Sequence, residues 1–298
     1  MSRAGRVALV GRPNAGKSTL LNRLLGEKLA IVSDKPQTTR TRLVGILTEE
    51  RGQIVLFDTP GIHRPLHRMN REMVRQAEQA LGEADLVCLL VDASIPFGKG
   101  DAFLLDLVGR ATAPRVAVLN KIDLVAKPRL LPLMARYGEG ERFAEIVPVS
   151  ALTGDGCDAL RECLWRHLPE GEPFYDPELL TIHPERFLVA ERIREKLLDL
   201  TRDEIPFTTA VLLESWQESG PPPALLRIDA SILVESESQK RIVVGKQGAM
   251  VRAIGTAARL DLEEYLGRKV YLGLHVRCEP DWREDPRRLA ELGRDSGL

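Results

Sequence analysis

The sequence lacks several features that would assign it at once to a class of protein. The formal net charge is −1, so binding to nucleic acid would need a local basic patch instead of a global positive field. The four cysteines show no C-x-x-C pair and no metal-ligand spacing, which favours reduced thiols in a cytosolic protein. No apolar run reaches the ~18 residues of a membrane span, and the N-terminal residues do not resemble a secretion signal. We therefore expect a cytoplasmic protein.

The first part of the chain alternates between strand and helix patterns. Segments with apolar residues at helical spacing lie between short apolar runs, which are typical of strands buried on both faces. These runs occupy residues 7–10, 54–57, 86–91, 115–120 and 145–150. The alternation predicts an α/β domain with a mostly parallel sheet and helices on both faces.

The pattern changes after residue 168. Residues 168–185 carry four prolines and several acidic residues, as is typical of a linker. A smaller α+β domain is predicted beyond them, with helices and alternating strands at 185–201, 207–216, 225–236, 269–278 and 285–294. A length of 298 residues suits about two domains. The predicted boundaries are 1–170 for the first domain, 171–182 for the linker and 183–298 for the second domain.

The most specific motif is GRPNAGKST at residues 11–19, directly after the first apolar run. G-x-x-x-x-G-K-[ST] between a strand and a helix is the P-loop, in which the glycines let successive backbone N–H groups point at phosphate oxygens. We expect Lys17 to reach the β- and γ-phosphates and Ser18 to hold Mg²⁺. The predicted nucleotide-binding residues of this loop are Gly11, Arg12, Pro13, Asn14, Ala15, Gly16, Lys17, Ser18 and Thr19.

A second motif, FDTPG at residues 57–61, ends the next buried strand. It places Asp58 at the carboxyl edge of the sheet, where ligands bind in open α/β folds. There Asp58 can hold Mg²⁺ through water, while the Gly61 N–H faces a γ-phosphate. Asp-Thr-Pro-Gly is also a good turn, so this motif is weak by itself.

Two more motifs, NKID (120–123) and SAL (150–152), end later strands and suit a guanine base. The Asp123 carboxylate can accept hydrogen bonds from guanine N1–H and the exocyclic amine, which adenine does not present on that edge. Asn120 is expected to tie this loop to the P-loop, and Lys121 to lie along the base. Backbone N–H groups of Ser150 and Ala151 can meet guanine O6.

The four motifs in this order resemble the GTPase G domain, which implies that the ligands are GTP or GDP and Mg²⁺. The resemblance places switch I at residues 33–42 and implies that Thr39 completes the Mg²⁺ shell with Ser18 and Asp58. Thr38, one position away, is the alternative.

Two positions distinguish this chain from Ras-like G domains. Ile62 stands where Ras-like proteins carry the glutamine that orients water, and isoleucine cannot position water. Asn14 occupies the P-loop position at which translation-associated GTPases have an asparagine, and in that group the asparagine helps to hold K⁺ near the phosphates. The catalytic residues that the resemblance implies are Lys17, Asn14, Thr39 and Gly61.

The second domain contains another glycine pair, in GKQG at residues 245–248. A G-x-x-G loop before an amphipathic helix is typical of KH domains, where the main chain approaches the backbone of four single-stranded nucleotides. An ordinary helix-entry turn is the alternative. The predicted order of elements resembles the type II KH fold, although the RIVVG segment before the loop reads as a strand where KH domains have a short helix. The predicted RNA-binding residues are Gly245, Lys246, Gln247, Gly248, Lys240, Arg241 and Arg252.

A G domain, a short linker and a type II KH domain resemble the Era family of bacterial GTPases over nearly the whole chain. GRPNAGKSTLLN, QTTR, DTPGIH, NKID and VGKQG all occur in the order of that family. The resemblance implies a GTPase that binds the 3′ end of small-subunit ribosomal RNA and assists assembly of the small subunit, with the GTP state gating RNA binding. It also implies a monomer that associates peripherally with the inner face of the cell membrane in some settings.

Two other functions fit parts of the sequence. One is a signalling switch whose second domain is a scaffold, which the basic G-x-x-G loop disfavours. The other is an RNA-binding module whose G domain no longer hydrolyses GTP, and Ile62 is the feature that favours it.

Overall fold

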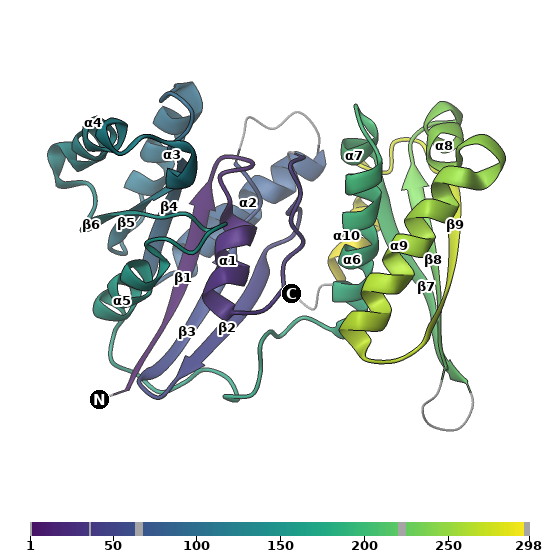
Figure 1. The fold of residues 1–298 in the computed structure, drawn as a ribbon, viewed down its shortest axis with the longest axis horizontal. Helices are drawn as coiled ribbons and strands as arrows, with labels where there is room; N and C mark the ends of the chain where they lie inside the picture. Colours follow the sequence, from purple (N-terminus) through teal and green to yellow (C-terminus); the bar gives the residue numbers. More distant parts are fainter. Residues whose placement is uncertain (1, 36, 63–67, 220–224, 295–298) are drawn as a thin grey trace. The chain divides into compact units, whose positions relative to one another are not determined.

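The computed structural model describes residues 2–35, 37–62, 68–219 and 225–294. The chain forms two compact units, Met1–Ile182 and His183–Leu298 (Figure 1). Among the helices of the described residues, none is both long and apolar enough to cross a membrane.

The first unit is built on a six-stranded sheet in the order β2-β3-β1-β4-β5-β6. Its strands are β1 (Arg3–Gly11), β2 (Leu43–Glu49), β3 (Gly52–Asp58), β4 (Leu86–Asp92), β5 (Arg115–Asn120) and β6 (Glu145–Pro148). All neighbours pair in parallel except β2, which runs antiparallel to β3 at the edge. The five apolar runs of the sequence are β1, β3, β4, β5 and β6, so the predicted parallel sheet is confirmed.

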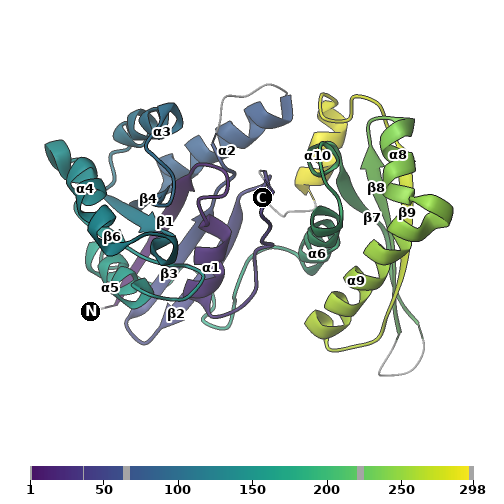
Figure 2. The same ribbon diagram turned by 45° about the horizontal axis from the view of Figure 1, so that its top comes forward.

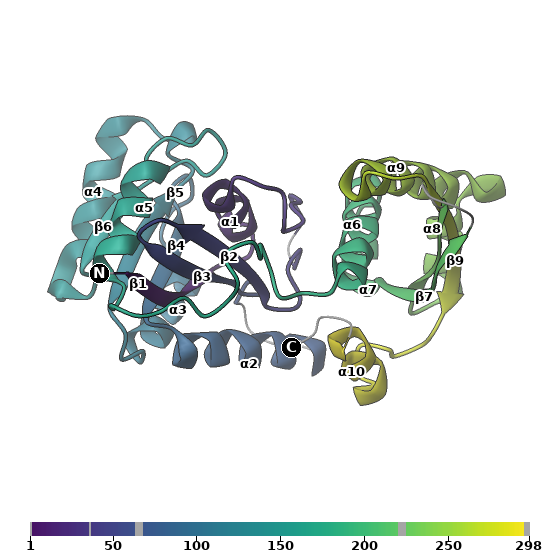
Figure 3. The ribbon, with the colours of Figure 1, turned by 90° about the horizontal axis from the view of Figure 1, so that it is seen from below.

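Helices cover both faces of this sheet (Figures 2 and 3). They are α1 (Lys17–Leu25), α2 (Arg68–Glu83), α3 (Lys99–Gly109), α4 (Lys127–Gly138) and α5 (Cys157–His167). Apolar side chains of α2, α3 and α4 pack into one core with alternate residues of the central strands. Helices α1 and α5 pack against each other, and Figure 3 shows them on the other face. This alternation brings the carboxyl ends of the parallel strands to one edge.

The segment predicted as a linker, 171–182, packs along the first unit. The buried Gln53 side chain accepts hydrogen bonds from the N–H groups of Phe174 (2.9 Å) and Tyr175 (3.0 Å). Further on, the Ile46 N–H of β2 donates to the Leu180 carbonyl at 2.8 Å. The linker therefore adheres to the edge strand that directly follows switch I.

The second unit has a three-stranded sheet in the order β7-β8-β9, with β8 antiparallel to β7 and parallel to β9. Its elements are α6 (Glu185–Leu200), α7 (Ile205–Thr208), β7 (Ala210–Ser219), β8 (Leu225–Val234), α8 (Glu237–Val244), a 3₁₀ turn η3 (Lys246–Gly248), α9 (Ala249–Leu266), β9 (Val270–Cys278) and α10 (Pro286–Arg294). Apolar residues of α6, α8 and α9 pack on one face of the sheet (Figure 3). The predicted α+β fold with its final helix is confirmed.

One element differs from the sequence pattern. The RIVVG segment, which reads as a strand, forms the end of helix α8. Ser236 is the N-cap of this helix, and its hydroxyl accepts from the Gln239 N–H at 3.3 Å, while the Gln239 side chain accepts from the Glu235 N–H at 2.9 Å. The S-x-x-Q capping signal therefore outweighs the strand preference of two adjacent valines. This short helix before the glycine loop is the arrangement that KH domains have.

Candidate nucleotide and RNA sites

The four predicted motifs of the first unit meet at the carboxyl edge of the sheet, around a cavity of about 500 Å³. The cavity is lined by Pro13, Asn14, residues 16–19, residues 31–34, residues 37–39, Gly61, Asn120, Lys121, Asp123, Leu124, Ala151 and Leu152. Of the predicted nucleotide-binding residues, Gly11, Arg12, Ala15, Asp58 and Ser150 do not line it. Three of the lining residues lie outside every predicted motif, namely Ile31, Val32 and Leu124. Residues 33 and 34 belong to the predicted switch I, and Leu152 ends the SAL motif.

The P-loop turns at Gly16, which is the N-cap of α1 with a φ of 91°. Within the described residues no side chain caps this helix, so the N–H groups of its first turn are left for a ligand. A Cβ atom at position 16 would lie 2.2 Å from Asn120 Nδ2. Glycine is therefore required here by both the backbone angle and the close approach of Asn120.

Lys17 lies folded over the loop with its side chain almost completely buried. Its Nζ donates to the Arg12 carbonyl at 3.2 Å and to the Gly11 carbonyl at 3.5 Å. Burial lowers the pKa of Lys17, and the nearby Asp58 carboxylate opposes that shift. A buried ammonium whose acceptors are neutral carbonyls is stabilised further by a phosphate, because a hydrogen bond between two oppositely charged groups is stronger than one to a neutral carbonyl.

Three oxygen-bearing side chains converge beside α1. Ser18 Oγ donates to Asp58 Oδ2 at 2.6 Å, and Thr39 Oγ1 lies 2.9 Å from Ser18 Oγ and 3.2 Å from the same carboxylate oxygen. Burial raises the pKa of Asp58, although the charge of Lys17 and the hydrogen bonds from Ser18 and Thr39 act to lower it. Thr38 instead donates from Oγ1 to the Lys35 carbonyl at 2.7 Å. The contacts therefore favour Thr39 over Thr38 as the switch I ligand.

These residues fit a magnesium ion. Asp58 Oδ1 is buried and has no hydrogen-bond partner in the described part of the chain, which is costly for a carboxylate unless a cation is bound nearby. The hydroxyls of Ser18 and Thr39 add hard oxygen donors of the kind that Mg²⁺ prefers.

Asn120 joins three loops of the site. Its Nδ2 donates to the Ala15 carbonyl at 2.8 Å, and its Oδ1 accepts from the Ala151 N–H at 2.9 Å. The expected link to the P-loop is present, together with a second link to the SAL segment. The Ser150 N–H also donates within the loop, to the Asp155 carbonyl at 2.8 Å. The Leu152 N–H is therefore the first in this segment that has no acceptor among the described residues. Leu152 is thus a further candidate donor to guanine O6.

The base-recognition segment is held from the neighbouring strand. Lys121 adopts a left-handed backbone angle (φ 66°), and its Nζ lies 2.5 Å from Asp92 Oδ2. Burial by itself would raise the pKa of Asp92, but hydrogen bonds from Lys121 and Ser94 bring it below its usual value. Asp92 ends β4 opposite Asn120 and was not predicted from the sequence, although an Asp at a strand end was the available signal. Asp123 is exposed beside the cavity and makes no side-chain hydrogen bond within the described residues.

Two P-loop side chains contact neighbouring elements. Arg12 Nη1 forms an ion pair with the buried Asp101 of α3 at 3.1 Å. Asn14 Nδ2 donates to the Asp34 carbonyl of switch I at 2.6 Å, while its Oδ1 has no partner among the described residues. Arg12 therefore holds the loop against α3, whereas Asn14 connects the loop to switch I and keeps an oxygen free.

Gly61 and Ile62 follow the Asp58 strand and have different surroundings. A Cβ at Gly61 would lie 2.7 Å from Pro13 Cα, so only glycine lets this segment approach the P-loop so closely. Ile62 donates its N–H to the Gly11 carbonyl at 3.3 Å, and its side chain is buried in the core with α2 and the central strands. The Ile62 side chain thus serves packing and does not face an attacking water.

The G-x-x-G loop of the second unit joins α8 to α9. Gly245 has a φ of 72°, and a Cβ there would lie 2.7 Å from Met250 Cβ, so glycine is required. Gly248, the N-cap of α9, has a φ of 77°. Between them, Lys246 and Gln247 are exposed, and no described residue is a hydrogen-bond or ion-pair partner of either side chain. The loop therefore presents its main chain and one free ammonium to solvent.

The other predicted RNA-contacting side chains flank this loop. Arg252 of α9 also has no ion-pair partner in the described part of the chain, whereas Lys240 lies 4.0 Å from Glu237 and Arg241 donates to the Glu237 carbonyl. Ile242, half exposed on α8, was not predicted and offers an apolar surface for a base. Free positive charge beside exposed glycine backbone suits a single strand of nucleic acid.

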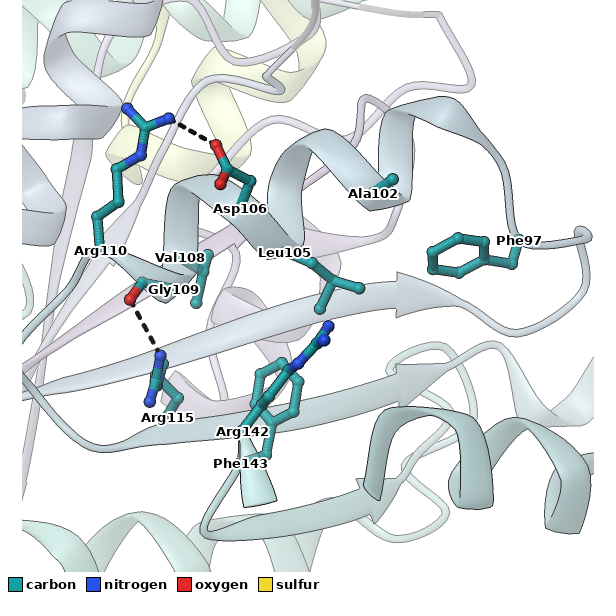
Figure 4. A pocket seen from close by; sticks show the side chains of 10 residues that line it. All are labelled: Phe97, Ala102, Leu105, Asp106, Val108, Gly109, Arg110, Arg115, Arg142 and Phe143. Carbon is teal, nitrogen blue, oxygen red and sulfur yellow. Dashed lines mark hydrogen bonds and ion pairs between the residues drawn. The ribbon is translucent and has the colours of Figure 1, made fainter. Parts of the chain in front are cut away.

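A separate hollow of about 570 Å³ lies between α3 and the segment that leads into β6 (Figure 4). Its lining includes Phe97, Leu105 and Phe143 together with Arg110, Arg115 and Arg142. Figure 4 shows Arg110 directed at Asp106 and Arg115 at the Gly109 carbonyl. None of the predicted nucleotide-binding residues lines this hollow. The chemistry therefore assigns the nucleotide to the smaller cavity at the strand ends.

Comparison with known proteins decides the family. Residues 6–121 match the family described as 50S ribosome-binding GTPase, and residues 204–283 match the KH domain. GTPase Era from Geobacter metallireducens is 50% identical over 291 residues, which cover 98% of this chain and 97% of that protein. The chain belongs to the Era family of GTPases.

Two solved Era structures share the whole fold. Era in complex with MgGDPNP and nucleotides 1506–1542 of 16S ribosomal RNA is 39% identical with a TM-score of 0.95, and the match covers 98% of this chain and 99% of that one. A variant of Era from Aquifex aeolicus bound to GDP·AlF₄⁻ is 38% identical with a TM-score of 0.93 and the same coverage. Membership of the Era family confirms the predicted P-loop GTPase domain followed by a KH domain, and with it a GTP-hydrolysing activity.

Proposed function

We propose that this Era-family GTPase binds the 3′ end of small-subunit ribosomal RNA through its KH domain and assists assembly of the small ribosomal subunit, with the GTP state gating RNA binding. The observation that best supports this is the presence, in one chain, of a guanine-type cavity and an exposed glycine loop. Beside this loop, Lys246 and Arg252 have no ion-pair partner among the residues that the structure describes. The related Era structure with MgGDPNP and 16S ribosomal RNA supports the same assignment.

In the proposed site, the chain's own groups position the phosphates. Lys17 and the first-turn N–H groups of α1 bind the β- and γ-phosphates, and the Gly61 N–H, which has no acceptor among the described residues, faces the γ-phosphate. Ser18, Thr39 and Asp58 would hold Mg²⁺, which supplies positive charge against the phosphate oxygens. Asp123 accepts from the guanine edge, and the Leu152 N–H donates to O6.

The RNA target is tested by titration of the protein, loaded with a non-hydrolysable GTP analogue, with a labelled RNA of the small-subunit 3′-end sequence. A scrambled RNA of the same length and composition is the control. We expect the native sequence to bind at least about tenfold more tightly, because bases splayed on a KH surface are recognised by their edges. Equal affinity for the two RNAs would contradict the proposed target.

Potassium is proposed as a second cation of the site, at Asn14. Its Oδ1 has no partner among the described residues, and its Nδ2 donates to the Asp34 carbonyl of switch I, so the free oxygen belongs to a side chain that joins the P-loop to switch I. A K⁺ ion there would perform part of the electrostatic work of an arginine finger, which is worth roughly 10³–10⁵ in rate. We expect single-turnover GTP hydrolysis to be at least about tenfold faster in KCl than in NaCl, and Asn14→Ala to remove the difference.

The matched control for this prediction is Ile62→Val. That change removes one methylene from the core at about 0.5–1.5 kcal/mol and leaves the cation site intact, so the K⁺ stimulation is expected to persist. Equal rates in the two salts for the unaltered protein would reject the potassium site and leave the GTPase itself unaffected.

We further propose a monomer in the cytoplasm that associates peripherally with the inner face of the membrane. This part rests on the family resemblance. Sedimentation with anionic lipid vesicles tests the membrane association, and an absence of vesicle binding would contradict it. The molar mass in solution tests the monomer, and a stable dimer would contradict it.

A further inference from the structure

A cysteine, a histidine and a glutamate converge in the G domain, away from the nucleotide cavity. Cys163, His167 and Glu145 each place one possible ligand atom within 4.8 Å of the other two, and they are the one group of this kind found among the described residues. The whole chain has five histidines and four cysteines, so few such meetings are expected by chance. Spacing along the sequence could not show this group, because Glu145 comes from another element.

The fold places the three side chains firmly. Cys163 and His167 lie four residues apart on α5 and so share one face of the helix, while Glu145 is the first residue of β6. His167 Nε2 lies 2.9 Å from Glu145 Oε1, and Arg166 donates to Glu145 Oε2 at 3.0 Å. Cys163 is fully buried, whereas the side chains of His167 and Glu145 are 25% and 29% exposed. The group is therefore ordered by packing and still open to solvent on one side.

The group offers anionic ligands to a divalent cation. An ionised Cys163 and Glu145 would carry two negative charges, one of which Arg166 offsets through its ion pair with Glu145 at 3.0 Å. The carboxyl end of α5 adds the negative end of a helix dipole, part of which the Arg3 guanidinium neutralises by donating to the Arg166 and Leu168 carbonyls. The hydrogen bond from Arg166 orients the carboxylate, as outer partners of metal ligands do.

We propose that Glu145, Cys163 and His167 form a Zn²⁺ site whose fourth position is open to water. Tetrahedral zinc with Zn–S of about 2.3 Å and Zn–N or Zn–O of about 2.0–2.2 Å needs donor atoms roughly 3.3–3.6 Å apart, so a shift of about 1 Å within the group is sufficient. A thiolate with an imidazole selects zinc over Mg²⁺. On binding, the Cys163 thiol releases its proton to solvent and its sulfur bonds to the metal.

The ion would join the start of β6 to the last turn of α5. The connection between these elements carries Ser150, Ala151 and Leu152, the segment that approaches the guanine base. At roughly 3.3 Å per residue of extended chain, Glu145 lies no more than about 16 Å from Ser150. Zinc here would stabilise the β6–α5 unit through this cross-link. The proposal does not depend on the proposed function in RNA binding.

The test uses the whole protein, freed of metal by chelation and then supplied with excess Mg²⁺ and GDP to fill the nucleotide site. Co²⁺ is the probe, because a cobalt–thiolate bond gives a near-ultraviolet charge-transfer band that oxygen ligands at Ser18 and Asp58 cannot give. We expect the band to saturate at one Co²⁺ per chain and to disappear when Zn²⁺ is added.

Variants locate the site. Cys163→Ala should remove the band, and His167→Gln should raise the Co²⁺ dissociation constant at least about tenfold, the scale of effect that even an outer partner of a metal ligand has. Cys278→Ala, which alters the half-exposed cysteine at the end of β9, is the matched control and should keep the band. GDP binding by each variant shows whether that variant is folded. If Cys163→Ala does not fold, the Co²⁺ dissociation constant of His167→Gln tests the site instead. Absence of a thiolate band in the unaltered protein, or a band unchanged in the folded variants, would overturn the proposal.

Discussion

Replacing Asp123 by asparagine is expected to change the nucleotide preference of this protein from guanine to xanthine. The exposed Asp123 carboxylate beside the cavity has no competing partner among the described residues, so both of its oxygens are available to the N1–H and amino groups of guanine. Asparagine places a donor against one of these donors. A site built around base hydrogen bonds rejects a mismatched partner by orders of magnitude, because the facing groups stay unpaired. We expect a loss in GTP affinity of at least about a hundredfold.

The measurement is a fluorescence titration with GTP, ATP and XTP analogues. Asp158→Asn is the matched control, since Asp158 lies in the first turn of α5 and does not line the cavity. The control should keep the GTP affinity of the unaltered protein, whereas Asp123→Asn should prefer XTP. Comparable affinities of the unaltered protein for ATP and GTP would end the guanine assignment.

Introducing Lys246→Asp together with Gln247→Asp is expected to abolish binding to the 3′-end RNA while GTP binding survives. Both side chains are exposed and without partners among the described residues, so their loss removes no contact of the fold. Gln247 has a φ of 52°, which aspartate tolerates better than most residues. Stability should therefore change by no more than about 0.5 kcal/mol. The two carboxylates, however, would face RNA phosphates at the point where the glycine backbone comes closest.

The measurement is an RNA titration at several salt concentrations, with a melting curve and a GTP titration on the same double variant. Gln217→Asp with Lys269→Asp is the matched control, because it makes the same change of charge on exposed positions of β7 and of the turn before β9. For the unaltered protein, log affinity should fall with log salt at a slope of about −0.7 per phosphate neutralised. Undiminished RNA affinity in the folded loop variant would show that this loop is not the RNA contact.

The nucleotide cavity could be predicted from sequence because its chemistry is local. Each motif ends a buried strand, and parallel strands bring their carboxyl ends to one edge, so Lys17, Asp58 and Asn120 had to lie near one another. The glycines of the loops could also be interpreted locally, because each marks a turn or a close approach of the backbone. Gly16, Gly61 and Gly245 stand where a Cβ would collide with a neighbouring residue.

The details that depend on contacts between distant segments could not be predicted. The ion pair of Arg12 with Asp101 joins positions 89 residues apart, and no sequence pattern shows that the guanidinium turns away from the phosphates. The Ala151 N–H was free in the sequence interpretation because only the structure shows the Asn120 side chain accepting from it. Thr38 and Thr39 are chemically the same, and only the fold brings one of them to Asp58.

Helix α8 shows a different limit of prediction from sequence. The strand preference of RIVVG is a local signal, but the cap at Ser236 and the packing of Val243 in the core of the second unit outweigh it. Propensity at short apolar segments is weak compared with capping and burial. A search for S-x-x-Q before the apolar residues would have predicted the helix.

Coupling between nucleotide state and RNA binding is best measured by titrating the two-domain protein, loaded with Mg²⁺ and either GDPNP or GDP, with the same 3′-end RNA. The packing of the linker on β2, the strand directly after switch I, provides a physical connection between Thr39 and the segment that leads to the KH domain. A typical coupling of 1–3 kcal/mol corresponds to about 5–150-fold in affinity. We predict that the GDPNP form binds the RNA more tightly by a factor in this range, and that the RNA tightens GDPNP binding by the same factor. Equal RNA affinity in the two nucleotide states would contradict gating by GTP.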